Sequence, residues 1–168
     1  MPIQFRLLTI TDQPILWEML RYAAQEPSVE AVKEQPLLRK YVEQFGRSGD
    51  CGIVAMLKEQ AIGAAWLRLW SEQERGLSYL DNQTPELAMA VLPDYRQQGV
   101  GTQLLSHLIE LATPQFPAIS LSVRAENPAI ALYERFGFGK IPNSEIKNRV
   151  GDISFLMKRP LSSKDIKQ

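Results

Sequence analysis

One stretch constrains the fold of this chain more than any other: Arg96-Gln97-Gln98-Gly99-Val100-Gly101-Thr102. An apolar run at 86–92 precedes it and predicts a strand, and apolar residues at helical spacing from Val100 to Leu111 predict an amphipathic helix. A strand that turns through two glycines into a helix leaves free backbone N–H groups at the positive end of the helix dipole. Since glycine has no Cβ to fill the hollow between them, residues 97–102 are expected to bind a phosphate or pyrophosphate.

The residues that are missing narrow the class of phosphate ligand. A P-loop needs Gly-x-x-x-x-Gly-Lys-Ser/Thr, but no lysine follows Gly101. A dinucleotide-binding fold needs Gly-x-Gly-x-x-Gly near the start of a βαβ unit, whereas this chain has only Gly99-x-Gly101, late in its length. Two interpretations remain: a loop for another phosphorylated cofactor, and an ordinary turn whose glycines permit tight packing.

A second patterned stretch, residues 123–138, predicts a strand, a capped helix and another strand. Asn127 is a favoured N-cap residue, and Pro128 suits the first helical position because its missing N–H would have no partner there. Gly137 is expected to end the helix in the left-handed conformation that glycine adopts readily.

The two stretches together resemble the motifs of the GNAT superfamily, the acetyl-CoA-dependent N-acetyltransferases. Arg96-x-x-Gly99-x-Gly101 resembles the pyrophosphate loop of that family, and residues 123–138 resemble its second motif. With the flanking strands, the resemblance covers nearly the whole chain. It implies an α/β (α+β) GNAT fold, in which a mixed, strongly twisted sheet of about seven strands carries helices on both faces.

The order of predicted elements agrees with such a fold. Asp12 is expected to cap a first helix that Pro27 ends, and residues 1–160 are expected to form a single domain with a polar tail at 161–168. The other predicted helices cover 36–45, 99–112 and 128–136. Strands are predicted over 3–8, 52–57, 61–70, 86–92, 118–124, 138–141 and 153–158.

The resemblance implies acetyl-CoA as the acyl-donor cosubstrate and assigns residues to it. Backbone amides of the strand 86–92 would hold the pantetheine arm, and those of the glycine loop, with the Thr102 hydroxyl, would bind the pyrophosphate. Arg96 would lie near the phosphates, and Asn127 would touch the arm. The implied cofactor-binding residues are Met89, Ala90, Val91, Arg96, Gln97, Gln98, Gly99, Val100, Gly101, Thr102, Asn127 and Tyr133.

Acetyl transfer needs an amine that has lost its proton, a site for the developing oxyanion and a proton for the leaving thiolate. The resemblance makes Tyr133 the candidate general acid, although helical periodicity alone would make it a core aromatic. It makes Glu86 the candidate base, acting directly or through water; the alternative is a solvated residue at a strand start. His107 and Cys51 are not expected in the site, and no metal site is predicted.

The acceptor is predicted only as a primary amine of an undetermined small molecule or protein, which reacts in a ternary complex. Residues 26–34 and 142–152 are the expected walls of its pocket. Glutamates in the first wall would favour a cationic amine, or simply form a solvated helix face. The aromatic residues near the 71–84 loop are candidates for a pocket floor or for strand packing: Trp66, Trp70 and Tyr79.

Composition limits the remaining function classes. Nineteen basic residues balance nineteen acidic ones, so no net field is expected to attract nucleic acid or an anionic membrane. One cysteine and the absence of a signal-peptide pattern lead us to expect a cytoplasmic protein. It is expected to be a monomer or a homodimer. The alternative to an enzyme is a non-catalytic acyl-CoA-binding sensor or regulatory domain of the same fold.

Overall fold

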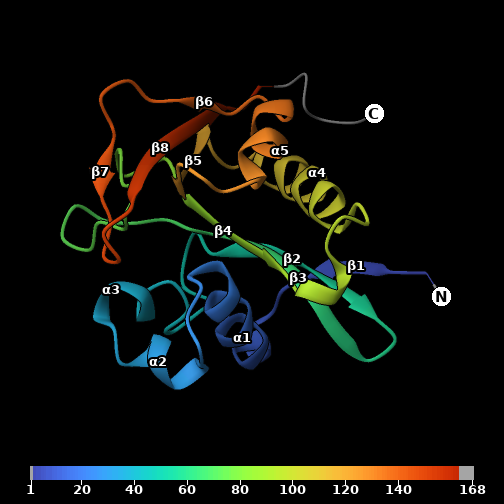
Figure 1. The fold of residues 1–168 in the computed structure, drawn as a ribbon. Coiled ribbons are helices and arrows are strands. Elements are labelled where there is room, and N and C mark those ends of the chain that lie inside the picture. The colour runs from blue at the N-terminus through green and yellow to red at the C-terminus, as the bar shows by residue number, and fades with distance from the viewer. Residues whose placement is uncertain (1, 163–168) are drawn as a thin grey trace.

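The computed structural model describes residues 2–162, and these form one mixed sheet with helices on both faces (Figure 1). Neighbouring strands follow the order β1-β2-β3-β4-β5-β8-β6, and β7 pairs with β8. The strands are β1 (Gln4–Leu7), β2 (Cys51–Leu57), β3 (Gln60–Arg68), β4 (Glu86–Val91), β5 (Ala118–Arg124), β6 (Gly139–Lys140), β7 (Ile146–Lys147) and β8 (Ile153–Pro160). The α-helices are α1 (Gln13–Ala23), α2 (Val29–Lys33), α3 (Pro36–Arg39), α4 (Val100–Ala112) and α5 (Ala129–Arg135).

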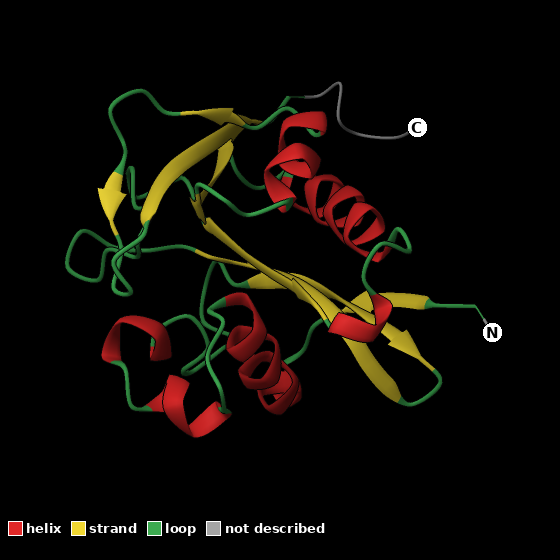
Figure 2. Cartoon of the chain, viewed as in Figure 1, coloured by secondary structure: helices red, strands yellow, loops and turns green. Residues whose placement is uncertain are grey.

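Two layers of helices cover the sheet (Figure 2). Helices α4 and α5 pack on one face, where the core includes Leu104, Leu108 and Leu121. Helix α1 and the segment around α2 and α3 pack on the other face, where the core includes Leu16 and Trp66. The predicted mixed sheet with helices on both faces is confirmed.

Several boundaries differ from the prediction. The helix predicted over 36–45 ends at Arg39, and the chain continues in turns in which Gln44 has a positive φ of 59°. Residues 29–33, predicted only as a wall, form α2, because the Ser28 side chain accepts a hydrogen bond from the Ala31 N–H. The prediction also missed the short strand β7, whose two exposed residues leave no apolar alternation to detect.

Strand β8 extends to Pro160, beyond its predicted end. Leu161 is half-buried and its N–H donates to the Pro117 carbonyl at 2.9 Å, so the first residue of the predicted tail is held against the core. The rest of the predicted tail, from 163 to 168, lies outside the described residues.

The position of the site follows from the divergence of β4 and β5. Strand β4 pairs with β3 from Glu86 to Val91, but within the described residues it pairs with β5 only at Glu86↔Ser120. Beyond that pair the two strands separate (Figure 1). The Leu92 N–H donates to the Ile62 carbonyl of the β3 side at 2.8 Å. Because peptide groups alternate along an antiparallel ladder, those of Met89 and Val91 point away from β3 and into the divergence.

Candidate functional site

The glycine loop, residues 96–99, follows the end of β4 that lies away from the Glu86↔Ser120 pair. Residues 96–99 are exposed, and helix α4 begins directly after them at Val100. Gly99 has a left-handed φ of 82°, and a Cβ at this position would meet nothing within 4 Å. Backbone conformation, rather than lack of space, therefore explains the glycine at this position.

The first turn of α4 presents backbone donors to solvent. The first N–H groups of a helix have no intrahelical partner, and no side chain caps this one. The Arg96 Nε donates to the Val91 carbonyl at 2.9 Å, and the Gln98 amide donates to the Asp94 carbonyl at 3.1 Å. These two bonds fix the loop while its N–H groups stay available, which suits a pyrophosphate.

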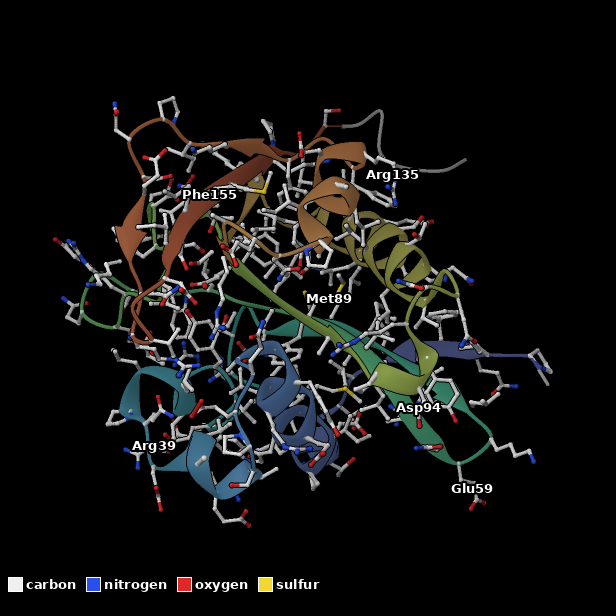
Figure 3. The ribbon with its side chains drawn as sticks, viewed as in Figure 1. Arg39, Glu59, Met89, Asp94, Arg135 and Phe155 are labelled. Carbon is white, nitrogen blue, oxygen red and sulfur yellow. The ribbon has the colours of Figure 1, made fainter. Side chains whose placement is uncertain are left out.

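Behind the loop, side chains from three elements meet. A Cβ on Gly101 would lie 3.3 Å from Leu132 Cδ2 of α5 and 3.9 Å from Met89 Cε, so a larger residue would separate α4 from α5 and β4. Figure 3 shows Met89 between β4 and the two helices. Ala90 packs in the core of the opposite face. Thus β4 directs its Met89 side chain toward α4 and α5, while its peptide groups line the divergence.

Asn127 ends the loop between β5 and α5. Its Oδ1 accepts a hydrogen bond from the Ala129 N–H at 2.8 Å, so it supplies the expected cap. The helix itself begins at Ala129, one residue later than predicted, and Gly137 ends it with the expected positive φ of 91°. Asn127 also lines a cavity of about 470 Å³ between the end of β5 and the segment before β8.

Tyr133 lies on α5 with its ring edge against Phe138, at 5.7 Å between ring centroids. The residue is only 8% exposed, and burial raises the pKa of Tyr133 to about 12. No residue within 2–162 forms a hydrogen bond with its hydroxyl, and the raised pKa keeps that hydroxyl protonated at neutral pH.

Glu86 is enclosed at the other end of β4. The residue is 4% exposed, so the alternative of a solvated strand start is wrong. Its carboxylate accepts three hydrogen bonds: from Tyr41 Oη at 2.7 Å, Trp70 Nε1 at 2.9 Å and Ser78 N at 3.1 Å. Burial raises the pKa of the Glu86 carboxyl, and these hydrogen bonds oppose that shift. Its role as a base stays a prediction.

The sequence did not predict the aromatic surroundings of Glu86 correctly. Trp66 and Trp70 are buried, and Trp66 Nε1 donates to the Tyr41 carbonyl at 2.9 Å, so both pack in the core rather than floor an open pocket. Tyr79 is half-buried and donates to Asn82 at 2.6 Å. The local sequence around Tyr41 does not indicate its contact with Glu86, because the two residues are 45 positions apart in the chain.

The two predicted acceptor walls touch each other. Arg149, just after β7, pairs with Glu26 at 3.2 Å and donates to the Ala24 carbonyl at 2.6 Å. Arg124 donates to Gln25 at 2.7 Å and to the same Ala24 carbonyl at 3.2 Å. The charge of Glu26 is therefore compensated, and only the exposed Glu30 and Glu34 give the first wall an acidic character.

The two residues not expected in the site lie elsewhere. His107 is exposed on α4, with its ring 5.0 Å from that of Phe5 in β1. Cys51 begins β2, which β3 separates from β4, and burial raises the pKa of its thiol to about 11. A thiol of that kind is a poor nucleophile at neutral pH.

Comparison with known proteins agrees with this geometry. The model of the Acetyltransferase (GNAT) family matches residues 15–138. The chain belongs to the GNAT acetyltransferase family. The prediction of an N-acetyltransferase, rather than a non-catalytic binding domain, is confirmed, and its relatives carry names of that activity.

One GNAT relative is an N-alpha-acetyltransferase of Saccharolobus solfataricus, which is 33% identical over 131 residues, or 72% of this chain and 75% of the relative. The crystal structure of the ribosomal-protein-S18-alanine N-acetyltransferase of Escherichia coli has a TM-score of 0.67 at 25% identity and covers 96% of this chain and 95% of that one. The PaiA N-acetyltransferase of Thermoplasma acidophilum, solved with coenzyme A, has a TM-score of 0.62 at 21% identity over 95% of this chain and 99% of that one.

No helix within residues 2–162 is long and apolar enough to cross a membrane.

Proposed function

We propose that this GNAT enzyme transfers an acetyl group from acetyl-CoA to the N-terminal α-amine of a polypeptide, by direct transfer in a ternary complex. The observation that carries the proposal is the divergence of β4 and β5, which has the donor-rich glycine loop at its open end. The two relatives whose names specify an α-amine or alanine acceptor support the acceptor class.

When bound, acetyl-CoA would supply the acetyl group as a thioester. Backbone N–H groups of residues 97–102 and the Thr102 hydroxyl would hold its pyrophosphate, with Arg96 beside them. Peptide groups of Met89 and Val91 would hold the arm and polarise the thioester carbonyl. Asn127, at the cavity between β5 and β8, would contact the arm near its reactive end.

Tyr133 would donate the proton that the leaving thiolate needs. Its pKa of about 12 keeps the phenol protonated over the whole physiological range. The absence of a hydrogen bond to its hydroxyl from residues 2–162 leaves the proton free for transfer.

Glu86 would accept the proton of the incoming amine through a water. Its carboxylate is buried and accepts three hydrogen bonds, so direct contact with a bulky acceptor is disfavoured. Its raised pKa makes it a stronger base than an exposed glutamate. The α-amine has a reference pKa of about 7.7–8.0, so a modest base suffices.

The cavity of about 470 Å³ is the proposed entrance for the peptide. It has charged side chains of both signs, from Arg124, Glu126 and Asp152, which suit a chain end with an ammonium and polar amides. We include a cytoplasmic location in the proposal, because nascent chains and ribosomal proteins present free α-amines there.

Coenzyme A release with matched peptides tests this function. One peptide has a free α-amine and no lysine, and the control has the same sequence with a blocked α-amine and one lysine. We expect release with the first peptide only, and mass spectrometry should place the acetyl group on its first residue. Release with the lysine peptide or only with small polyamines would contradict the proposed acceptor. No release with any amine would contradict the enzyme itself.

A further inference from the structure

The point where β4 and β5 part is held by a side-chain cluster in which Glu86 is joined by two buried serines that have no part in the proposed chemistry. The strands meet at Glu86↔Ser120, where the Ser120 N–H donates to the Pro85 carbonyl at 3.0 Å. Ser78, from the segment between β3 and β4, is fully buried beside this pair. We name Ser78, Glu86 and Ser120 the clasp.

Ser78 bonds to both strands. Its N–H donates to Glu86 Oε1 at 3.1 Å, and its carbonyl accepts from Ser120 Oγ at 2.9 Å. The two serine hydroxyl oxygens lie 2.8 Å apart. When Ser120 Oγ donates to the Ser78 carbonyl, it can also accept a hydrogen bond from the Ser78 hydroxyl. Each polar side chain of the clasp therefore has a hydrogen-bond partner within the clasp.

The segment that carries Ser78 is fixed from its other side as well. The Leu77 N–H donates to Tyr41 Oη at 2.8 Å, and Lys40 Nζ donates to the Glu74 and Arg75 carbonyls at 2.9 and 2.8 Å. A Cβ on Gly76 would collide with the Trp70 indole and the Glu86 carboxylate. The clasp is therefore a rigid end to the divergence and cannot widen without breaking buried hydrogen bonds.

The clasp and the glycine loop mark opposite ends of one strand. Between Glu86 and Val91, β4 rises by roughly 3.3 Å per residue. An arm whose pyrophosphate is held at 97–102 and which follows β4 inward has its acyl end directed toward the clasp. The Ser120 and Glu86 side chains lie on the face of α1 to α3, since both bond to Ser78 and Glu86 also bonds to Tyr41 of that layer.

We propose that the clasp closes the acyl end of the cofactor slot and restricts the enzyme to acetyl over longer acyl groups. This inference rests on the proposed use of acetyl-CoA. A propionyl or butyryl group would extend into the Ser78–Ser120 pair and force one of its buried hydroxyls to lose its partner. One methylene in a close-fitting pocket changes discrimination by about 10–200-fold.

The test compares Ser120→Ala, which removes both hydroxyl bonds of Ser120, with the control Thr113→Ala. Thr113 Oγ1 donates to the Ile109 carbonyl at 2.6 Å at the far end of α4, so the control also loses one hydroxyl bond. Titration calorimetry gives the dissociation constants of acetyl-CoA, propionyl-CoA and butyryl-CoA, and coenzyme A release gives kcat/KM for each.

We expect the wild type and Thr113→Ala to bind and use acetyl-CoA at least about tenfold better than propionyl-CoA. Ser120→Ala should reduce that ratio at least threefold in both measurements, a limit we set as the criterion of the test. Ser78→Ala, which keeps the backbone bonds to both strands, should reduce it less.

An unchanged ratio in a folded Ser120→Ala protein, or a wild type without preference, would overturn the inference. If Ser120→Ala does not fold, the same measurements are made on Ser78→Ala. An unchanged preference for acetyl-CoA over propionyl-CoA in that variant would also overturn the inference. The binding ratios remain measurable even if no amine is acetylated, so failure of the proposed function is distinguishable from failure of the clasp.

Discussion

The two ends of β4 differ in how far the protein satisfies its own polar groups. At the Val91 end, the exposed loop 96–99 leads to a helix whose first N–H groups have no side-chain cap. At the Glu86 end, the carboxylate is 4% exposed and accepts three hydrogen bonds from the protein. One end is open and incomplete, and the other is closed and complete.

Solvation explains why polar groups can lack protein partners at the Val91 end of β4 but not at the Glu86 end. A buried polar group without a partner costs several kcal/mol, so the Glu86 end must be complete before any ligand arrives. Donors that face water cost little and can exchange that water for an anion. We therefore expect the open end to bind an anionic ligand and the closed end to be a fixed boundary against which bound groups are positioned.

The largest expected effect concerns Tyr133, the proposed proton donor, which is buried on α5. Tyr133→Phe keeps the ring contact with Phe138 but removes the proton donor, so kcat should fall by about 10²–10⁴-fold with little change in acceptor KM. Steady-state kinetics and a melting curve check both parts. A wild-type kcat in a stable Tyr133→Phe protein would mean that water or substrate supplies the proton.

The pH profile refines this prediction. Because burial raises the pKa of Tyr133 to about 12, the acid form persists well above the ordinary phenol pKa of about 10. The rate should therefore rise through the pKa of the acceptor amine and stay level up to about pH 10. A falling limb centred near pH 10 that disappears in Tyr133→Phe would show that the phenol is not buried in solution.

A smaller effect separates a chemical from a structural role for the closed end. Glu86→Gln removes the proton acceptor but also disturbs the bond from Tyr41, so Tyr41→Phe, which breaks that bond and keeps the carboxylate, is the matched control. If Glu86 takes the amine proton, Glu86→Gln should slow the reaction by up to about 10²-fold at pH 6 and recover as the pH rises.

Tyr41→Phe should keep the pH dependence of the wild type. Profiles of log(kcat/KM) against pH, measured for all three proteins, decide the question. Parallel profiles for Glu86→Gln and the wild type would remove Glu86 from proton transfer and leave it a purely structural member of the closed end.

The smallest effect on activity is expected at Asp12, a buried carboxylate remote from both ends of β4. Its hydrogen bond with Arg6, at 2.8 Å, lowers the pKa of Asp12, and the Thr9 N–H assists. A lowered pKa contributes stability above the unfolded-state value of about 3.9, and this contribution is lost as the pH falls through the folded-state value.

Asp12→Asn should thus lower the free energy of unfolding at pH 7 by about 1–3 kcal/mol and leave kcat unchanged. Denaturant titrations at pH 7 and pH 3 should show that the difference in the free energy of unfolding between the wild type and Asp12→Asn is smaller at pH 3. Glu86 has the opposite sign, since its raised pKa gives a contribution that is lost as the pH rises through the folded-state value. If the stability difference between the wild type and Asp12→Asn does not depend on pH, the assigned ion pair between Arg6 and Asp12 is contradicted.

The sequence predicted the open end well because its signals are local. The turn at Gly99, the helix predicted over 99–112 and the left-handed Gly137 each follow from a few neighbouring residues. The structure has all three, with the helix beginning one residue later, at Val100. Tyr133 and Asn127 could be singled out because they lie in one short motif. Boundaries such as the end of α3 at Arg39 were less certain, since no proline or sharp change in periodicity marks them.

The closed end could not be predicted in the same way. Glu86 contacts Tyr41 across 45 residues and Ser78 contacts Ser120 across 42. Such contacts depend on how the whole sheet brings β4 and β5 together. No periodic pattern in the segments that contain these residues predicts them. A glutamate at a strand start has the same local appearance whether it is solvated or enclosed.

The most direct test of a pyrophosphate site at the open end is the affinity for acetyl-CoA in Gly99→Asp and Gly99→Asn. Both side chains tolerate the left-handed φ of 82° and enter open space, so the two variants differ in charge alone. Calorimetry at low salt should show micromolar binding to the wild type, modestly weaker binding to Gly99→Asn and at least about tenfold weaker binding to Gly99→Asp, with the gap between the variants shrinking as salt rises. Equal affinities for the two variants at low salt would contradict a pyrophosphate site at this loop.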